Sequence, residues 1–268
     1  MNSEEMAQTM IKIRDNTKTI KNKILVMSGK GGVGKSTVAV NLALALADEG
    51  FKTGLMDVDL HGPNVSRMVG LKKTPEVIEE QIFPPEVLPN LKVMSISSFI
   101  EEEAPVVWRG PMKTTAIYQF LGDVAWGELD FLVIDSPPGT GDEPLTILQT
   151  LPDVSALIVT TPQEVAIQDV KRAINLVKTM HRKALGLVEN MSYMKCPGCG
   201  ERINLFGQGG GERLSKSHSI PLLANLPFDP RLVGMADSGQ GITTHLRGSE
   251  LEEAYRNMVK SVLQRVSE

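Results

Sequence analysis

Hydrophobic residues occur along the chain in short continuous runs, separated by longer stretches in which apolar and polar positions follow a helical spacing. A run of about four to eight apolar residues bounded by polar or glycine-rich sequence is typical of a buried strand. We expect such strands at residues 23–28, 53–57, 91–96, 131–135, 155–160, 184–190 and 222–226. Helices are expected between them at 36–49, 112–123, 143–150 and 165–180. This alternation predicts an α/β fold, with a mostly parallel, doubly wound sheet and helices on both faces.

The two ends of the chain carry weaker patterns. Residues 4–20 predict a short helix, so residues 1–22 are interpreted as an N-terminal tail or short helix. Residues 23–268 are interpreted as a single domain, with an exposed, glycine-rich insertion at 194–211. The last segment, 249–266, has apolar residues at helical spacing and mixed charges. It is predicted to pack on its own domain, because a membrane-binding helix carries a basic polar face.

Composition narrows the function classes. The chain has 268 residues, of which 41% are hydrophobic and 22% charged, and its net charge is −4. This charge gives no reason to expect nucleic acid or an anionic membrane as partner. No apolar run approaches the roughly 18–20 residues that span a bilayer. The N-terminus is polar and mixed in charge, unlike a secretory signal, so a cytoplasmic location is expected.

A phosphate-binding motif follows the first predicted strand. The pattern G-x-x-x-x-G-K-[ST] is met at every fixed position by Gly29, Lys30, Gly31, Gly32, Val33, Gly34, Lys35 and Ser36. Its glycines allow backbone N–H groups to surround phosphate, next to the positive end of the following helix. Lys35 is expected to reach the β- and γ-phosphates, and the Ser36 hydroxyl to bind Mg²⁺, while Thr37 completes the nucleotide site. The motif therefore predicts binding of ATP and Mg²⁺, with hydrolysis of the ATP.

Acidic residues end two of the predicted strands. Asp135 follows a buried strand in the manner of a Walker-B aspartate, which orients Mg²⁺ through water. The loop after it, 136–142, has two prolines and two pivot glycines, as suits a switch that senses the γ-phosphate. Asp57 and Asp59 end another strand and can point to one side, because alternate strand residues share a face. We expect one of this pair to position the attacking water and Asp57 to join the Mg²⁺ site.

Lys30 is an additional lysine inside the phosphate loop. A second cation beside the phosphates can stabilise transition-state charge in the manner of an arginine finger. The lysine is best placed for this role if it comes from a partner subunit. The catalytic candidates are therefore Lys30, Lys35 and Asp59.

The two cysteines of the chain, Cys196 and Cys199, stand together as Cys-x-x-Cys. Three interpretations remain open: a redox dithiol, half of a zinc site, or half of an iron–sulfur site. A zinc or [4Fe–4S] site needs four ligands, and the four histidines have no ligand spacing. A two-fold homodimer completes the number, because each subunit contributes both cysteines at the axis. An exposed cluster held in this way suits transfer to another protein.

Together, these motifs resemble those of a known group of proteins. The segment 30–35 is similar to the deviant Walker-A loop of the MinD/ParA/nitrogenase-iron-protein class of dimeric ATPases. Within that class the chain resembles the Mrp-type (ApbC-like) iron–sulfur cluster carrier ATPases over about residues 20–245. The resemblance rests on the segments 57–64, 107–112, 135–142, 188–192 and 196–199.

The resemblance has several implications for the site. It implies that ATP is held between two subunits with Lys30 acting across the dimer, and that Asp59 is the hydrolytic or Mg²⁺-linked aspartate. Asn190 and the turn that begins at Pro227 would contact the adenine. A bridging [4Fe–4S] cluster would be received from an assembly scaffold and passed to apo iron–sulfur proteins. Slow hydrolysis would serve as a switch on dimer geometry.

The sequence departs from the group in three ways. His61 stands at a position that is variable in the group, and neither a four-cysteine ferredoxin-like segment nor an accessory domain is expected at the N-terminus. Two other functions stay open as alternatives. One is a MinD/ParA-like positioning ATPase, and the other is an ATPase regulated by a disulfide between the two cysteines.

Overall fold

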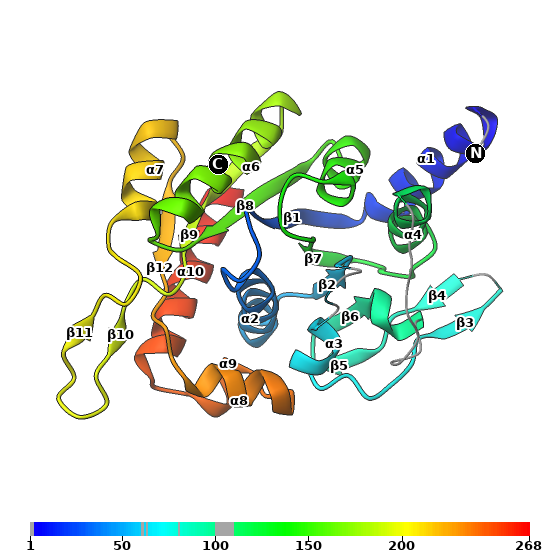
Figure 1. Cartoon of the computed structure of the whole chain (residues 1–268). Coiled ribbons are helices and arrows are strands. Elements are labelled where there is room, and N and C mark those ends of the chain that lie inside the picture. The colour runs from blue at the N-terminus through cyan, green and yellow to red at the C-terminus, as the bar shows by residue number, and fades with distance from the viewer. Residues whose placement is uncertain (1–2, 60–61, 63, 80, 100–109) are drawn as a thin grey trace.

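The computed structural model describes residues 3–59, 62, 64–79, 81–99 and 110–268. Its centre is a sheet with the strand order β12-β9-β8-β1-β7-β2-β6-β5 (Figure 1). The strands are β1 (Ile20–Ser28), β2 (Thr53–Asp57), β5 (Glu86–Leu88), β6 (Leu91–Ser95), β7 (Leu129–Asp135), β8 (Val154–Thr160), β9 (Lys183–Glu189) and β12 (Leu222–Asn225). Neighbouring strands are parallel, apart from β5, which runs antiparallel to β6. The predicted parallel sheet is confirmed.

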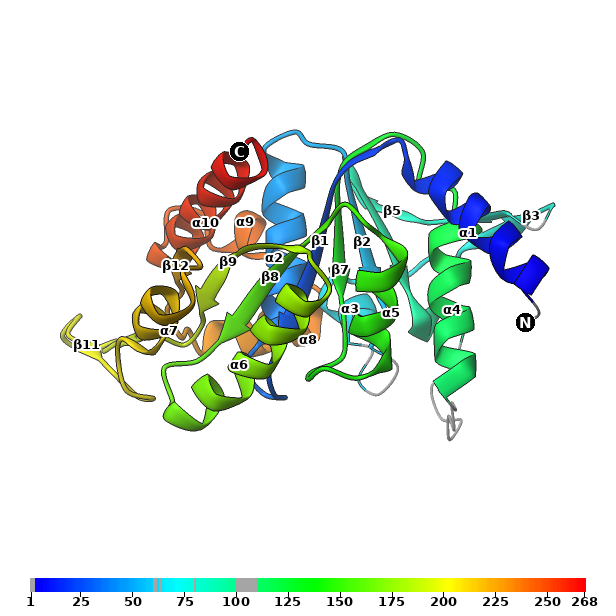
Figure 2. The same ribbon diagram turned by 90° about the horizontal axis from the view of Figure 1, so that it is seen from above.

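Helices cover both faces of this sheet (Figure 2). One face carries α2 (Lys35–Asp48), α3 (Val65–Met68), α8 (Arg231–Ser238), α9 (Ile242–His245) and α10 (Glu250–Val266). The other face carries α1 (Ser3–Thr17), α4 (Gly110–Gly122), α5 (Asp142–Thr150), α6 (Glu164–Thr179) and α7 (Gly210–His218). The sheet is therefore doubly wound, as predicted.

The two hydrophobic cores follow from the alternation of side chains along each strand. Ile24 and Val26 of β1 belong to the core beneath α2 and α10, whereas Leu25 and Met27 belong to the core beneath α5 and α6. Successive strand residues point to opposite faces, so a strand covered on both sides must be apolar throughout. The apolar face of α10 is buried against its own domain, as expected for segment 249–266.

Shorter elements lie outside the sheet. A hairpin of β3 (Glu76–Ile78) and β4 (Gln81–Phe83) precedes β5, and the 3-10 helix η1 (Ile96–Phe99) follows β6. A second hairpin, β10 (Met194–Lys195) and β11 (Arg202–Ile203), carries the cysteines in the turn between its strands. In the part of the chain that the structure describes, no helix is long and apolar enough to cross a membrane.

The expected domain boundaries need adjustment at two places. The boundary after residue 22 falls inside β1, and Ile13 and Ile20 are buried in the core beneath α4. The predicted short helix is present as α1, and it is part of the packed domain and not a peripheral tail. The insertion 194–211 also ends differently, because Gly210 and Gly211 are buried at the start of α7.

Candidate nucleotide and cysteine sites

The phosphate loop joins the end of β1 to the start of α2, and close packing shapes it. A Cβ atom on Gly29 would lie 2.2 Å from the backbone carbon of Asp169 in α6. Gly34 caps α2 with φ of 80°, a left-handed conformation that favours glycine. A Cβ there would lie 2.2 Å from Nδ2 of Asn190. Glycine is therefore required at both ends of the loop for steric reasons.

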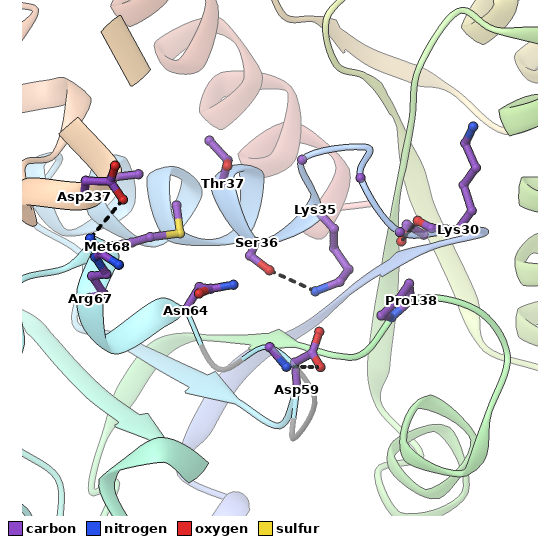
Figure 3. Close-up of a pocket in the computed structure, with 16 residues that line it drawn as sticks. Lys30, Lys35, Ser36, Thr37, Asp59, Asn64, Arg67, Met68, Pro138 and Asp237 are labelled. Carbon is purple, nitrogen blue, oxygen red and sulfur yellow. Dashed lines mark hydrogen bonds and ion pairs between the residues drawn. The ribbon is translucent and has the colours of Figure 1, made fainter. Parts of the chain in front are cut away.

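Lys35 lies at the centre of the loop's charge network. Its Nζ donates to Oδ1 of Asp135 at 2.5 Å and to Oγ of Ser36 at 3.2 Å. Both partners of the ion pair are buried, since the Lys35 and Asp135 side chains are 6% and 1% exposed. The loop lysine therefore contacts both the helix hydroxyl and the aspartate that ends β7. Figure 3 shows Lys35 turned toward Ser36.

Two buried carboxylates stand side by side at the ends of β2 and β7, where Asp57 and Asp135 are register partners. Burial, followed by repulsion from Asp135, raises the pKa of Asp57 to about 8. Burial also raises the pKa of Asp135, against the opposing attraction of Lys35. Asp57 Oδ1 accepts the backbone N–H of Asp59 at 2.9 Å, and Oδ2 accepts the Ser95 hydroxyl at 2.8 Å.

The aspartate pair that the sequence placed on one side is divided between two environments. Asp59 lines a pocket of about 370 Å³ beside the loop, and its Oδ1 accepts the backbone N–H of Gly62 at 3.2 Å. Asp57 is absent from the pocket lining and instead holds the backbone of Asp59. The structure thus brings Asp59 to the loop, whereas Asp57, like Asp135, lies outside the pocket lining, and its part in a Mg²⁺ site stays a prediction.

The rest of the pocket includes residues that sequence reasoning did not single out. Arg67 and Met68 of α3 and Ala236 and Asp237 of α8 form its far side (Figure 3). Arg67 and Asp237 form an ion pair at 3.3 Å between the two helices. Asn64 and Pro138 also line the pocket, and both lie in quoted motifs that could have indicated them. No pattern in the sequence marks the residues of α3 and α8, because both helices are short.

Lys30 lines the pocket but is turned away from its centre. Figure 3 shows its side chain pointing away from Lys35 and Asp59. Its Nζ donates to Oε1 of Gln163 at 3.3 Å. Within one copy of the chain, this lysine does not join the cluster of Lys35, Ser36 and Asp59.

Asn190 contacts the loop, and Pro227 lies in the segment after β12. Asn190 is buried and its Nδ2 donates to the carbonyl of Val33 at 2.9 Å. Pro227 is also buried, and neither residue is among those lining the pocket. Asn190 therefore supports the loop from outside the pocket, and adenine contact by either residue stays a prediction. His61 and residues 107–109, which the resemblance also used, lie outside the described residues.

The cysteines lie at the tip of the β10–β11 hairpin, which projects from the domain (Figure 1). The Cys196 N–H donates to the carbonyl of Glu201 at 2.9 Å, and the Gly200 N–H to the carbonyl of Cys196 at 2.8 Å. Backbone N–H groups of Cys199 and Gly198 hydrogen bond to the Cys196 sulfur and lower the pKa of its thiol. Both cysteines are free thiols, with Cys199 exposed and Cys196 partly exposed. Among the described residues, no group of three or more His, Cys, Asp or Glu side chains could hold a metal ion.

Comparison with known proteins identifies the family. The family model of ParA, described as NUBPL iron-transfer P-loop NTPase, matches residues 19–263. The chain belongs to this family. It is 46% identical over 264 residues to the iron-sulfur cluster carrier protein of Methanocaldococcus jannaschii, covering 97% of this chain and 90% of that protein. As an iron-transfer P-loop NTPase it is an ATPase of the MinD/ParA fold class.

Solved structures agree with this assignment. A nucleotide-binding protein from Archaeoglobus fulgidus, solved in complex with ADP, has a TM-score of 0.77 and 41% identity. The match covers 86% of this chain and 91% of that chain. The cell-division ATPase MinD of Pyrococcus furiosus has a TM-score of 0.67 over 91% of this chain and 99% of its own, at 23% identity. The likeness to MinD shows a shared fold alone.

The buried polar groups beside the pocket of this iron-transfer P-loop NTPase suit Mg²⁺ together with a nucleotide. Asp135 Oδ2 is buried and has no hydrogen-bond partner. A buried carboxylate oxygen left unpaired is unfavourable, and Mg²⁺ prefers oxygen ligands, often with water between. The Ser36 hydroxyl lies at the same Lys35 Nζ that contacts Asp135. Ser36 and Asp135 are therefore groups that fit such an ion.

Proposed function

We propose that this ATPase is a carrier that holds a [4Fe–4S] cluster between two copies of the chain and delivers it to apo-proteins. One observation carries the proposal: each copy presents two free thiols at an exposed turn, without a third ligating side chain grouped with them in the described part of the chain. A [4Fe–4S] cluster takes four thiolate ligands. A two-fold homodimer supplies them, since Cys196 and Cys199 of each copy meet at the axis.

The nature of the cargo is supported by the relatives. The protein of M. jannaschii is named an iron-sulfur cluster carrier protein, and the matching family model is one of iron transfer. The exposed cysteine turn can be reached by other proteins. The cluster would accordingly be received from an assembly scaffold and released to apo iron–sulfur proteins.

The nucleotide pocket supplies the switch. Loop N–H groups and Lys35 would bind the phosphates, and Asp59, which lines the pocket, would orient the attacking water. Ser36 and Asp135 would hold Mg²⁺, which neutralises phosphate charge when bound. Phosphate binding would give Lys35 a second partner and so loosen its pair with Asp135. We expect slow turnover, because hydrolysis serves to switch the dimer from one geometry to the other and not to make a product.

Lys30 supports an arrangement in which two copies share the nucleotide. Its side chain leans toward Gln163 and away from the pocket centre of its own copy. From the partner subunit it would face the phosphates as an added cation and stabilise transition-state charge. ATP would then favour the same dimer that completes the four-thiolate site.

The experiment is anaerobic reconstitution with iron and sulfide, followed by iron analysis per dimer. We expect about four iron atoms per dimer in the wild type and loss of the cluster in Cys199→Ala. Glu201→Gln, in the same turn, is the matched control, because only the backbone carbonyl of Glu201 pairs with Cys196. Stoichiometric zinc, or an intramolecular disulfide with no metal, would overturn the carrier function.

A further inference from the structure

Glu250, the first residue of α10, contacts both strands of the cysteine hairpin. Its Oε2 lies 2.6 Å from Nζ of Lys195, and its Oε1 lies 3.2 Å from a guanidinium nitrogen of Arg202. Lys195 directly precedes Cys196, and Arg202 stands three residues after Cys199. One carboxylate therefore forms ion pairs with the hairpin on both sides of the two cysteines.

Tyr193 completes this cluster at the base of the hairpin. Its hydroxyl donates to Oε1 of Glu250 at 2.8 Å, and the guanidinium of Arg202 lies 4.2 Å from the centre of its ring. Burial, followed by the hydrogen bond to Glu250, raises the pKa of Tyr193 to about 12. Burial works to raise the pKa of Glu250, but hydrogen bonds from Lys195 and Tyr193 outweigh it and lower that pKa.

The hairpin has few other supports. Within the described residues, β10 and β11 pair only with each other. A two-stranded hairpin is marginally stable at best in water without further packing. The helix that carries Glu250 is itself well fixed. The N-terminus of α10 is capped by Ser249, and its Leu251 and Tyr255 are buried in the core. An anion in the first turn is also favourable for the helix.

We propose that Glu250 is the positioning residue of the cysteine pair. It fixes the hairpin to α10, so that both thiols of each copy approach the shared cluster in one orientation. This role rests on the proposed carrier function. It concerns orientation alone, since Glu250 itself has no contact with the cargo.

The test compares Glu250→Gln with Glu253→Gln, a control that removes the same charge from an exposed position in the same helical turn. The first readout is hydrogen exchange of the Cys196 and Gly200 amides in the protein without cluster. The second is the rate at which reconstituted dimer loses its cluster to a chelator. We expect both rates to rise about three- to ten-fold in Glu250→Gln, the range for a partly exposed ion-pair network, and to stay at the wild-type values in the control.

A double substitution separates positioning from a general effect on folding. Adding Lys195→Met to Glu250→Gln should accelerate hairpin exchange little further, whereas adding it to Glu253→Gln should accelerate it clearly. The melting temperature and the exchange of the phosphate-loop amides should stay unchanged. Exchange that rises throughout the chain, or a hairpin that is unaffected, overturns the proposal.

The two readouts also keep the positioning role apart from the carrier function. Hydrogen exchange needs no cluster, so it judges the Glu250 contacts even if the wild type binds no iron. If the wild type holds four iron atoms and Glu250→Gln loosens the hairpin without faster cluster loss, the positioning role fails and the carrier function stands.

Discussion

Nζ of Lys35 lies 2.5 Å from Oδ1 of Asp135, so the lysine that we propose binds phosphate is paired with the aspartate that we propose binds Mg²⁺. Both groups are buried, and each satisfies the other's charge where water cannot. Phosphate and Mg²⁺ offer replacement partners to the lysine and to the aspartate respectively. The two ligands should therefore bind cooperatively, since either one alone leaves a buried charge without its counterion.

Asp135→Asn tests this coupling. The amide cannot neutralise Mg²⁺, so we expect the affinity for Mg²⁺ in the presence of ATP to fall about ten- to a hundred-fold. Calorimetric titration of ATP with and without Mg²⁺ measures the effect. Asp130→Asn, at the other end of β7 and paired with Lys21, is the control and should bind as the wild type does. Unchanged Mg²⁺ dependence in Asp135→Asn would remove Asp135 from the metal site.

The pH dependence of stability should report Asp57. Because its pKa is raised from 3.8 to about 8, the protonated group favours the folded state. That contribution is complete below about pH 4 and is lost as the pH rises through 8. Asp57→Asn should flatten the decline in unfolding free energy between pH 5 and 8 by at least about 1 kcal/mol, since one pKa unit corresponds to about 1.4 kcal/mol. Urea denaturation of the nucleotide-free protein at both pH values measures this, and equal slopes in the two proteins would contradict it.

Lys30→Ala should reduce ATP turnover on the order of a thousand-fold while retaining nucleotide binding, as for loss of an arginine finger. Mixing it with Asp59→Asn distinguishes action within a copy from action across the dimer. If Lys30 acts across the dimer, each mixed dimer has one complete site, and activity should return to about a quarter of the wild-type rate. If it acts within its own copy, the mixture stays inactive. Gln163→Ala, which removes only the Lys30 hydrogen bond, is the control and should keep its turnover.

Gly29→Ala should destabilise the protein by more than about 2 kcal/mol, because the added Cβ would lie 2.2 Å from the backbone of α6, which cannot yield easily. Gly31→Ala is the matched control, since the nearest atom to its Cβ would be Pro138 Cγ at 3.9 Å. Chemical denaturation should give near wild-type stability for the control. Equal stability of the two variants would show that the loop can move away from α6.

Patterns confined to a few neighbouring residues were predictable from the sequence. The bounds of β2 were predicted without error, because a buried strand between polar residues leaves a clear signal. The meeting of Lys35, Ser36 and Asp135 also followed, since a parallel sheet brings the carboxyl ends of its strands to one edge. Lys30 and the cysteine pair were also singled out from the residues, and the family resemblance added their roles across a dimer.

Contacts between segments that are distant along the chain could not be predicted from the sequence. The approach of α3 to α8, where a Cβ on Gly239 would lie 2.5 Å from the Cα of Gly70, forms the far side of the pocket. Neither short helix has enough turns for periodicity to reveal its buried face. The helix that contains Ile13 was predicted, but its packing on α4 was not, because helical spacing does not distinguish a docked helix from a free one.

Backbone hydrogen bonds fix the chain to the domain where it enters the cysteine hairpin. The Ser192 N–H donates to the carbonyl of Leu226 at 2.9 Å, and the Phe228 N–H to the carbonyl of Tyr193 at 2.7 Å. These backbone bonds hold the entering limb of the hairpin against the segment that follows β12, and they do not depend on which side chains lie in the turn. The turn between the two strands can therefore be replaced without loss of these backbone bonds. A different metal-binding turn grafted between Lys195 and Arg202 would change the metal group that this ATPase binds and leave its nucleotide site unchanged.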